Sequence, residues 1–589
     1  MQFEIEHSPP PVPERRNLWQ STHDLLRVFS PSERLALYVL SITLALSAFV
    51  LLAEVNNLVS NRIPAAGGTL VEGGVGVPRF VNPVLATTPI DQDLTTLIYS
   101  GLLRPGSGGE YVPDAAYAYD ISEDGTIYTF HLREGLTFHD GEPLTSADVL
   151  FTVALAQNPD IKSPRRADWE GVAVAAPDEH TVVFTLPHAY APFLENATLG
   201  ILPRHVWADV AAEEFPFHAL NTRPIGSGPY ALSDAVFDST GAPTAYKLEA
   251  FSDFALGSPH ISTIVYRAYP NEDALRRAAE DGDIDSFVAA SPKTVPRELQ
   301  EQGEFIRIPQ TRVFGIFLNQ NHAPVLTDAS VRHALDAAVD KESLVGQILG
   351  GFGSALHSPI PYAVLPGSVA GAASSSAPGE TEDRAEAARQ ILSRGGWTYS
   401  EQTASTSAAW TKGETTLSIT LATADAEELV ATAHAVAEAW RAIGVPTEVQ
   451  IYPLQEFTQN VLRPRQYDAI LFGEAVGRSL DLFPFWHSSQ RNDPGLNLSL
   501  YTNADADRIL ASARASTDRE KRETLIRDFL ETIAADDPAV FLYSPEIAYL
   551  VPSYLQGIEI GPLSTPSERF WGVHEWYRDT ERVWDIFTQ

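Results

Sequence analysis

The chain has 589 residues, no cysteine and a formal net charge of −35. Its length exceeds what one hydrophobic core supports, so we expect two or three domains, and a hydrophobic content of 44% predicts a folded chain. The charge argues against nucleic acid or an anionic membrane surface as the main partner. The absence of cysteine excludes a disulfide framework, thiolate nucleophiles and cysteine-bound metals.

An uncharged segment lies near the start of the chain. As a helix, residues 35–53 would span about 28 Å, close to the hydrocarbon thickness of a bilayer. The apolar region of a signal peptide is shorter, and a buried helix would usually carry a polar stripe. We therefore predict a cytoplasmic segment at 1–34, an uncleaved transmembrane anchor at 35–54 and a polar linker at 55–66. The arginines before the span and Glu54 after it favour a cytoplasmic amino terminus and a body outside the cell.

A glycine-rich pattern follows the linker. Residues 67–85 predict a strand that ends in a turn at Asn82-Pro83. The glycines do not fit the G-x-G-x-x-G spacing of dinucleotide loops, so we expect no nucleotide site. Residues 94–103 fit an amphipathic helix, which Pro105 would end.

The next segment, from Gly125 to Val153, predicts a strand, a turn and a capped helix. Its first residues alternate between apolar and polar side chains, as in a half-buried strand. Asp140-Gly141 favours a turn, and Thr145 and Asp148 have the spacing of a capping box at the start of a helix.

This segment, YTFHLREGLTFHDGEPLTSADVLFTV, resembles the signature of the peptide- and nickel-binding solute-binding proteins of ABC importers, family 5. APFLENATLGILPRHVW (residues 191–207) continues the resemblance, and PIGSGPYAL (residues 224–232) is similar to the family's G-T-G-P-Y motif with serine in place of threonine. TRVFGIFLNQN (residues 311–321) looks like the family's crossover into a second lobe. The helix that follows carries the family's V-R-x-A-L-x-x-A-x-D pattern. The resemblance covers about residues 67–562.

Strands alternate with amphipathic helices beyond residue 382, which predicts an α/β lobe with a mixed or parallel sheet. The resemblance implies a two-lobed clamp of the periplasmic-binding-protein type. We expect lobe I at 67–310, with an inserted subdomain at about 94–222, and lobe II at 311–543. Residues 544–589 would return to lobe I and end in an aromatic-rich tail, for which the sequence gives no functional account.

The loop that begins GEAVGRSLDLFPFW occupies the position where, in the family, the end of a strand brings an aspartate to the amino group of a ligand. Ligands of open α/β sheets bind at the carboxyl ends of strands. This sequence departs from the family there, with Glu474 as the nearest acid and Asp481 as the alternative. Arg478 and Trp486 suit an organic ligand, although each could be an ordinary surface or core residue. With the family's other segments, the expected ligand-binding residues are Glu474, Arg478, Asp481, Trp486, Asn319, Gly228 and Tyr230.

Other motifs do not favour catalysis or metal binding. Asp281, Asp283 and Asp285 imitate the start of a calcium loop, but Pro292 stands where the loop needs a glutamate. The 15 histidines show no cluster with metal-ligand spacing. The sequence contains no H-E-x-x-H, G-x-S-x-G or Walker A motif. We therefore expect a protein that is not an enzyme and that needs no cofactor or metal.

The resemblance implies a membrane-anchored, extracellular or periplasmic substrate-binding subunit of an ABC importer. It would bind peptides or similar small solutes and deliver them to permease and ATPase subunits, and a nickel chelate stays open as the cargo. Two alternatives come from other classes of protein. One is an extracellular hydrolase that uses paired carboxylates, and the other is an anchored sensor that signals through a second protein.

Overall fold

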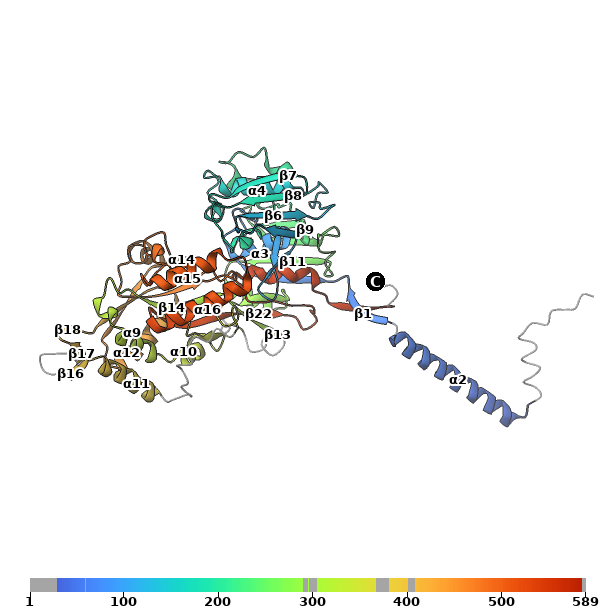
Figure 1. Cartoon of the computed structure of the whole chain (residues 1–589). Coiled ribbons are helices and arrows are strands. Elements are labelled where there is room, and N and C mark those ends of the chain that lie inside the picture. The colour runs from blue at the N-terminus through green and yellow to red at the C-terminus, as the bar shows by residue number, and fades with distance from the viewer. Residues whose placement is uncertain are drawn as a thin grey trace, which may run out of the picture. The chain divides into compact units, whose positions relative to one another are not determined.

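The computed structural model describes residues 29–58, 60–289, 295, 304–366, 381–400 and 408–584 (Figure 1). The chain divides into two compact units. One consists of Met1–Ala65 together with Asp579–Gln589, and the other, which we call the body, consists of Ala66–Arg578.

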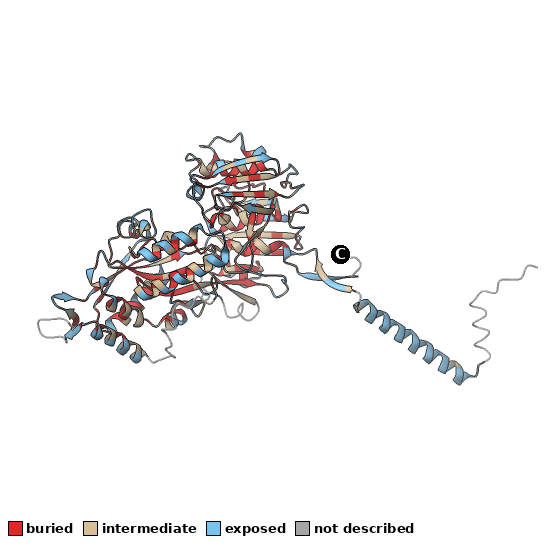
Figure 2. Cartoon of the chain, in the orientation of Figure 1, coloured by how far each residue is buried: buried red, intermediate tan, exposed pale blue. Residues whose placement is uncertain are grey.

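The first unit contains an apolar helix and a two-stranded sheet. Helix α2 runs over Pro31–Leu58, and by length and composition it could cross a membrane. Nearly all of its described residues are exposed (Figure 2). The predicted apolar helix near the amino terminus is therefore present. Strand β1 (Ser60–Ala65) pairs antiparallel with β23 (Asp579–Trp584), so the predicted linker is partly a strand.

A mixed sheet of 12 strands runs through the body. In order of pairing, its main path is β20 (Thr447–Tyr452), β19 (Ile419–Ala424), β21 (Ala469–Ala475), β14 (Arg312–Leu318), β22 (Ala539–Val551), β12 (Ser286–Ala289), β2 (Thr69–Val75), β11 (Thr263–Tyr269), β10 (Pro243–Ala250) and β9 (Tyr230–Phe237). Strands β13 (Glu304–Pro309) and β15 (Gly353–Ala355) also pair with β22.

The long strand β22 belongs to both halves of this sheet. Its residues 539–543 pair with β14, and its residues 546–551 pair with β13. Strands β13 and β14 are themselves separated only by residues 310–311. The chain thus crosses between the halves at two adjacent places. We call the half that contains β2 lobe I and the half that contains β14 lobe II; the predicted α/β class and the two lobes are both present.

Lobe II packs helices on both faces of its sheet. Along β14, Ile316 and Leu318 join one core cluster, while Val313 and Phe317 join a second cluster on the opposite face, as expected for alternating side chains. The first cluster includes residues of α9 (Ala329–Ala337), α10 (Lys341–Ile348), α11 (Thr381–Arg394) and α12 (Glu427–Ala442). The second includes residues of α14 (Phe483–Trp486), α15 (Ala504–Ala515) and α16 (Arg519–Asp536).

Lobe I carries a smaller antiparallel sheet. Its order is β5 (Ala116–Ile121), β6 (Ile127–Leu132), β8 (Thr181–Thr185) and β7 (Ala173–Asp178). The apolar side chains of β6 are buried, as their alternation predicts. Helix α4 (Ser146–Gln157) follows, and the capping box between Thr145 and Asp148 is formed, with the Thr145 N–H donating to the Asp148 carboxylate (2.9 Å).

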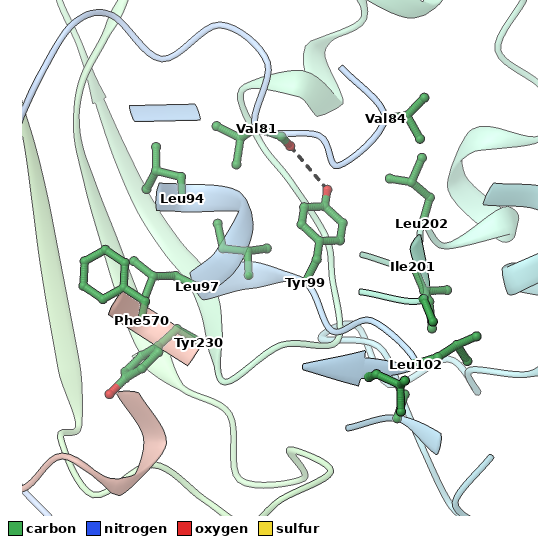
Figure 3. Close-up of a cluster of buried hydrophobic side chains, with 14 of the residues drawn as sticks. Val81, Val84, Leu94, Leu97, Tyr99, Leu102, Ile201, Leu202, Tyr230 and Phe570 are labelled. Atoms are coloured by element: carbon green, nitrogen blue, oxygen red, sulfur yellow. Dashed lines mark hydrogen bonds between the residues drawn. The ribbon is translucent and has the colours of Figure 1, made fainter. Parts of the chain in front are cut away.

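Helix α3 corrects one predicted boundary. It runs over Pro89–Ile98, five residues earlier than the helix expected at 94–103. The reason is local, because Thr88 caps the helix and proline occupies its first turn, both of which favour a start at this point. Leu94 and Leu97 of α3 face the lobe I core, where the Tyr99 hydroxyl donates to the carbonyl of Val81 (3.4 Å; Figure 3).

A buried charged cluster ties the C-terminal return to the start of lobe I. Arg569 lies on the 3₁₀ helix η8 (Pro566–Glu575) and donates to Glu72 of β2 (2.8 Å) and to Asp93 of α3 (2.7 and 2.8 Å). The three side chains are 7% exposed or less. The carboxylates also accept hydrogen bonds from the hydroxyls of Tyr266, Tyr549 and Ser286.

Substituting Arg569 with alanine should strongly destabilise the body. Removing one partner of a buried ion cluster leaves uncompensated charge, which costs about 3–5 kcal/mol in the free energy of unfolding. Urea unfolding followed by circular dichroism measures the loss. The control is Arg276→Ala, which removes an exposed arginine paired with Glu280 (2.7 Å) and should cost about 1 kcal/mol or less. Equal losses for the two variants would contradict this prediction.

Candidate ligand-binding site

A cavity of about 380 Å³ lies where lobe I, lobe II and the C-terminal return meet. Lobe I contributes residues of α3, the short strand β3 (Leu103–Pro105) and the short helix α5 (Phe193–Asn196). Lobe II contributes residues within 475–485, in the loop after β21, and the return contributes residues within 564–571. Ligand pockets occupy about 300–1,000 Å³, so this cavity suits a small organic ligand.

Two of the seven residues expected at the ligand site line this cavity. They are Arg478 and Asp481, both in the loop after β21. The other five are absent from its lining within the described part of the chain: Glu474, Trp486, Asn319, Gly228 and Tyr230. Their positions follow from the strands and turns that carry them.

Glu474 lies on the core side of β21. Because side chains alternate along a strand, Glu474 shares the face of Ile470, which packs in the second core cluster, whereas Ala475 lines the cavity. Glu474 is 5% exposed, and its Oε1 has no hydrogen-bond partner among the described residues. Burial raises the pKa of Glu474 well above its usual range, which disfavours the ionised carboxyl. A carboxyl buried in the core is not placed to bind an amine in this cavity.

Three of the expected residues hold the framework behind the cavity. Trp486 is 1% exposed and packs in the core of lobe II. The Asn319 amide donates to the carbonyl of Arg465 (3.0 Å) and accepts from two backbone N–H groups of the turn after β14. The Tyr230 hydroxyl donates to the carbonyl of Ile261 (3.0 Å) inside lobe I.

The two lobe I motifs that carry the family resemblance meet at His139. Its backbone N–H donates to the carbonyl of Gly226 (2.8 Å), and the N–H of Gly226 donates to its Nδ1 (3.3 Å). Burial lowers the pKa of His139 to about 4, so the neutral ring donates from Nε2 to the carbonyl of Gly228 (3.0 Å). A Cβ at Gly228 would lie 2.6 Å from the carbonyl carbon of Ile98, so this position requires glycine. These motifs shape the wall of the cavity from behind.

Carboxyl groups outnumber guanidinium groups in the cavity wall. The acidic residues are Asp114, Asp168, Glu195, Asp481 and Glu568, and the basic residues are Arg104, Arg165 and Arg478. Burial raises the pKa of each of the five carboxyls above its ordinary value. A nearby positive charge favours the ionised carboxyl, so this wall is suited to a ligand with a cationic group.

Arg478 connects lobe II to the C-terminal return. Its Nη2 donates to Oε2 of Glu568 (2.9 Å) and to the carbonyl of Pro562. The same Oε2 accepts from the backbone N–H of Ser564 (2.7 Å), and the guanidinium lies 5.5 Å from the centre of the Trp571 ring. The side chains of Arg478 and Glu568 are 5% and 9% exposed, so salt screens this pair only weakly.

A second cavity, of about 210 Å³, adjoins this ion pair. The residues that line both cavities are Arg104, Arg478, Glu568 and Trp571. These side chains therefore form a partition between the two spaces. Movement of the Arg478 side chain away from Glu568 would join the spaces and admit a longer ligand.

Glu195 and Asp481 differ in their partners. Asp481 lies 3.3 Å from Nε of Arg514 on α15, so its charge is already compensated. Glu195 has no ion-pair partner at such a distance among the described residues, although Arg165 and Arg478 act on it at longer range. A Cβ at Gly477 would lie 3.6 Å from Oε2 of Glu195, so this lobe I carboxyl faces the lobe II loop. Glu195 therefore differs from Asp481 in having neutral hydrogen-bonding partners, Tyr111 and Ser479, in place of a close guanidinium.

Comparison with known proteins assigns the chain to a family. Residues 110–494 match the model of the bacterial extracellular solute-binding proteins, family 5. The chain belongs to this family. The family predicted from the sequence motifs is therefore confirmed.

The relatives of this family 5 protein include peptide-binding proteins. The oligopeptide-binding protein AppA of Bacillus subtilis is 26% identical over 525 residues, which cover 87% of this chain and 92% of AppA. The dipeptide-binding protein of Escherichia coli K12 is 24% identical over 526 residues, which cover 84% of this chain and 92% of the relative.

Solved structures show the same fold. The structure of B. subtilis AppA in complex with a nonapeptide matches with a TM-score of 0.63 at 26% identity, covering 88% of this chain and 100% of AppA. NikZ from Campylobacter jejuni, in complex with Ni(L-His), has a TM-score of 0.62 at 23% identity, covering 86% of this chain and 99% of NikZ; this likeness concerns the fold alone. The predicted two-lobed periplasmic-binding-protein fold is confirmed.

Sequence reasoning missed four of the five carboxyls of the cavity wall, which are Asp114, Asp168, Glu195 and Glu568. Glu195 lies in the segment APFLENATLG, which the resemblance had already marked, so a search for acids within that segment could have found it. Asp114 lies in a short connection without a motif. Glu568 lies in the aromatic-rich tail, and no local pattern relates it to Arg478, because the two meet only in the folded chain.

Glu568→Gln should change the dependence of stability on pH. Burial raises the pKa of Glu568 from 4.5 to about 7, against the opposing charge of Arg478. Between these values the folded chain holds a proton that the unfolded chain has released, so this group's contribution to stability falls as the pH rises and is lost above about pH 7. Between about pH 5 and 8, the variant should gain about 3 kcal/mol in unfolding free energy relative to the wild type.

Urea unfolding at several pH values measures this difference. Glu575→Gln serves as the control, because Glu575 lies on the same 3₁₀ helix with a side chain that is 57% exposed. Its difference from the wild type should stay constant over the range. A constant difference for Glu568→Gln as well would show that the Glu568 carboxyl does not titrate in this window.

Proposed function

We propose that this chain is the membrane-anchored substrate-binding subunit of an ABC importer. It binds a peptide or a similar small solute outside the cytoplasm and delivers it to permease and ATPase subunits. Family membership supports the binding role, and the observation that carries the proposal is the charged cavity walled by both lobes. The family consists of solute-binding proteins, and we propose that this chain catalyses no reaction.

A short peptide, or another small zwitterion, fits the chemistry of the wall. Its amino group would meet Glu195, and its carboxylate would meet a guanidinium such as Arg104. A buried carboxyl without an ion-pair partner gains from a cationic ligand, because the ligand supplies the missing countercharge. The aromatic side chains of the wall would contact the apolar parts of the ligand: Tyr99, Tyr111, Trp169, Tyr190, Phe254, Phe485, Phe570 and Trp571.

Ligand binding would favour the closed clamp. A ligand that touches Glu195 of lobe I and the loop of lobe II binds the closed state better than the open state, and so it shifts the population towards closure. Binding with micromolar affinity corresponds to about 8 kcal/mol, which is enough to move an easily hinged pair of lobes. The hinge would lie at residues 310–311 and 544–545, where the chain crosses between the lobes.

The anchor is helix α2. Residues Pro31–Asn56 have a mean hydropathy of 2.5 and are long enough to span a bilayer. The arginines that precede the span favour a cytoplasmic amino terminus, which places the body outside.

Native mass spectrometry of the full chain, purified in mild detergent, tests the proposed function. We expect a bound small solute, such as a peptide, and co-purification of permease and ATPase subunits from the source membrane. An intact mass that lacks the amino-terminal residues would overturn the anchor. Cleavage of offered peptides by the purified chain would favour the hydrolase alternative.

Glu195→Gln should weaken the binding of a peptide with a free amino group about 10- to 100-fold, because a hydrogen bond to a charged group contributes about 1.5–3 kcal/mol. Isothermal titration calorimetry with the identified peptide and its N-acetylated form measures this effect, which the acetylated form should not show. The control is Glu474→Gln, the same substitution at a buried carboxyl outside the cavity. If Glu474→Gln alone weakened peptide binding, the partner of the ligand amine would be Glu474, at the end of β21.

A further inference from the structure

The C-terminal strand returns to the end of the apolar helix. Strand β23 pairs with β1 along its whole length, from Ala65 opposite Asp579 to Ser60 opposite Trp584. At the far end of this ribbon, Nε1 of Trp584 donates to Oδ1 of Asn56 (2.9 Å), which is 528 positions away in the sequence. Asn56 lies in the last turn of α2 and is also the last residue of its apolar span. The indole of Trp584 is thus fixed at the boundary of that span.

This position coincides with the membrane surface if α2 is the anchor, so the inference rests on the proposed function. A helix whose apolar residues fill the hydrocarbon core brings the end of its span to the headgroup region. Tryptophan is enriched at this level because its ring is apolar while its N–H needs a polar partner. Trp584 is 52% exposed, so its ring remains accessible to lipid while its N–H is satisfied by Asn56.

We infer that the C-terminal strand forms a juxtamembrane ribbon with the segment after the anchor, and that Trp584 inserts its ring into the lipid headgroup region. Two-stranded ribbons alone are marginally stable in water. The ribbon therefore gains from contacts at its Trp584 end, which are the bond to Asn56 and the burial of the ring among lipids. This inference gives the aromatic tail a role that the sequence alone does not indicate.

The charges of the ribbon identify the kind of lipid contact. Strands β1 and β23 together carry two arginines, Arg62 and Arg582, and two acids, Asp579 and Glu581. Their formal charges cancel, so the ribbon has no net electrostatic attraction to anionic lipids. The indole ring is then the element that recognises the bilayer, and a zwitterionic phosphatidylcholine surface is a sufficient partner.

The ribbon also changes what the predicted linker does. Residues 55–66 would form a free polar tether if unpaired, whereas pairing fixes half of them, Ser60–Ala65, in a strand. The body is joined to the ribbon by two peptide bonds, Ala65–Ala66 and Arg578–Asp579, in place of a single connection. A six-residue strand extends about 20 Å, which sets the reach of the ribbon from the end of the anchor.

Disulfide trapping tests the ribbon itself. The chain has no cysteine, so two introduced cysteines report only on each other. In the full chain in phosphatidylcholine nanodiscs, Arg62→Cys with Arg582→Cys should oxidise to an intramolecular cross-link, because these residues are directly opposite. The control pair, Arg62→Cys with Asp579→Cys, is three residues out of register and should cross-link at least tenfold more slowly. Equal rates, or no cross-link in either pair, would overturn the ribbon and leave the importer role intact.

Fluorescence quenching tests the lipid contact. Nitroxide lipids labelled near the headgroup should quench the tryptophan emission of the wild type more than that of Trp584→Phe, whereas lipids labelled at the chain end should quench both equally. Replacing half of the phosphatidylcholine with phosphatidylglycerol should not alter the difference. Identical quenching of the two proteins near the headgroup would overturn the membrane contact. Loss of residues 1–58 from the intact mass would overturn the anchor, and with it the membrane contact, while the cross-link would still report on β1 and β23.

Discussion

The burial of one arginine fixes the geometry of the cavity. Arg569 lies between Glu72 and Asp93, and this contact holds the C-terminal return against the first strand and first helix of lobe I. The preceding residue, Glu568, lines the cavity and meets Arg478 of lobe II. Buried ion clusters often stabilise a fold no better than apolar residues would, but breaking one is costly. The cluster therefore holds the C-terminal return in one position against lobe I. Because Glu568 precedes Arg569, the cluster also determines where Glu568 lies.

Polar contacts join the lobes across the cavity, while the connections between the lobes are strands. Residues 310–311 and 544–545 join two halves of the sheet that have separate cores, so a change of backbone angles there would disturb little packing. Across the cavity, Arg478 meets Glu568, and Glu195 faces the lobe II loop. In the proposed clamp these contacts would lose hydration on closing and recover it on opening, so their net free energy would be small compared with that of a core. A ligand could then shift the equilibrium between the open and closed states.

Sequence patterns predicted those parts of the molecule whose structure is set locally. The alternation in β6 and the capping box at Thr145 depend on neighbouring residues, and both are present. The positions of the site residues depended instead on strand register and on contacts between residues far apart in the sequence. Glu474 and Ala475 are adjacent, yet strand alternation puts the acid in the core and the alanine in the cavity wall. The partner of Arg478 lies in the C-terminal return, where no local motif indicates it.

This sequence departs from the family at the end of β21, and charged residues in other parts of the cavity wall accompany that departure. The sequence lacks the family's aspartate after β21 and brings Arg478 into that loop, where it meets Glu568 of the return. The wall carboxyl that has no close ion-pair partner among the described residues then comes from the opposite lobe, at Glu195, which is hydrogen-bonded to Tyr111 and Ser479. Burial raises the pKa of Glu195, and a positive charge placed beside this carboxyl would lower that pKa again. The proposed binding of an amine at Glu195 is therefore linked to the protonation of this carboxyl.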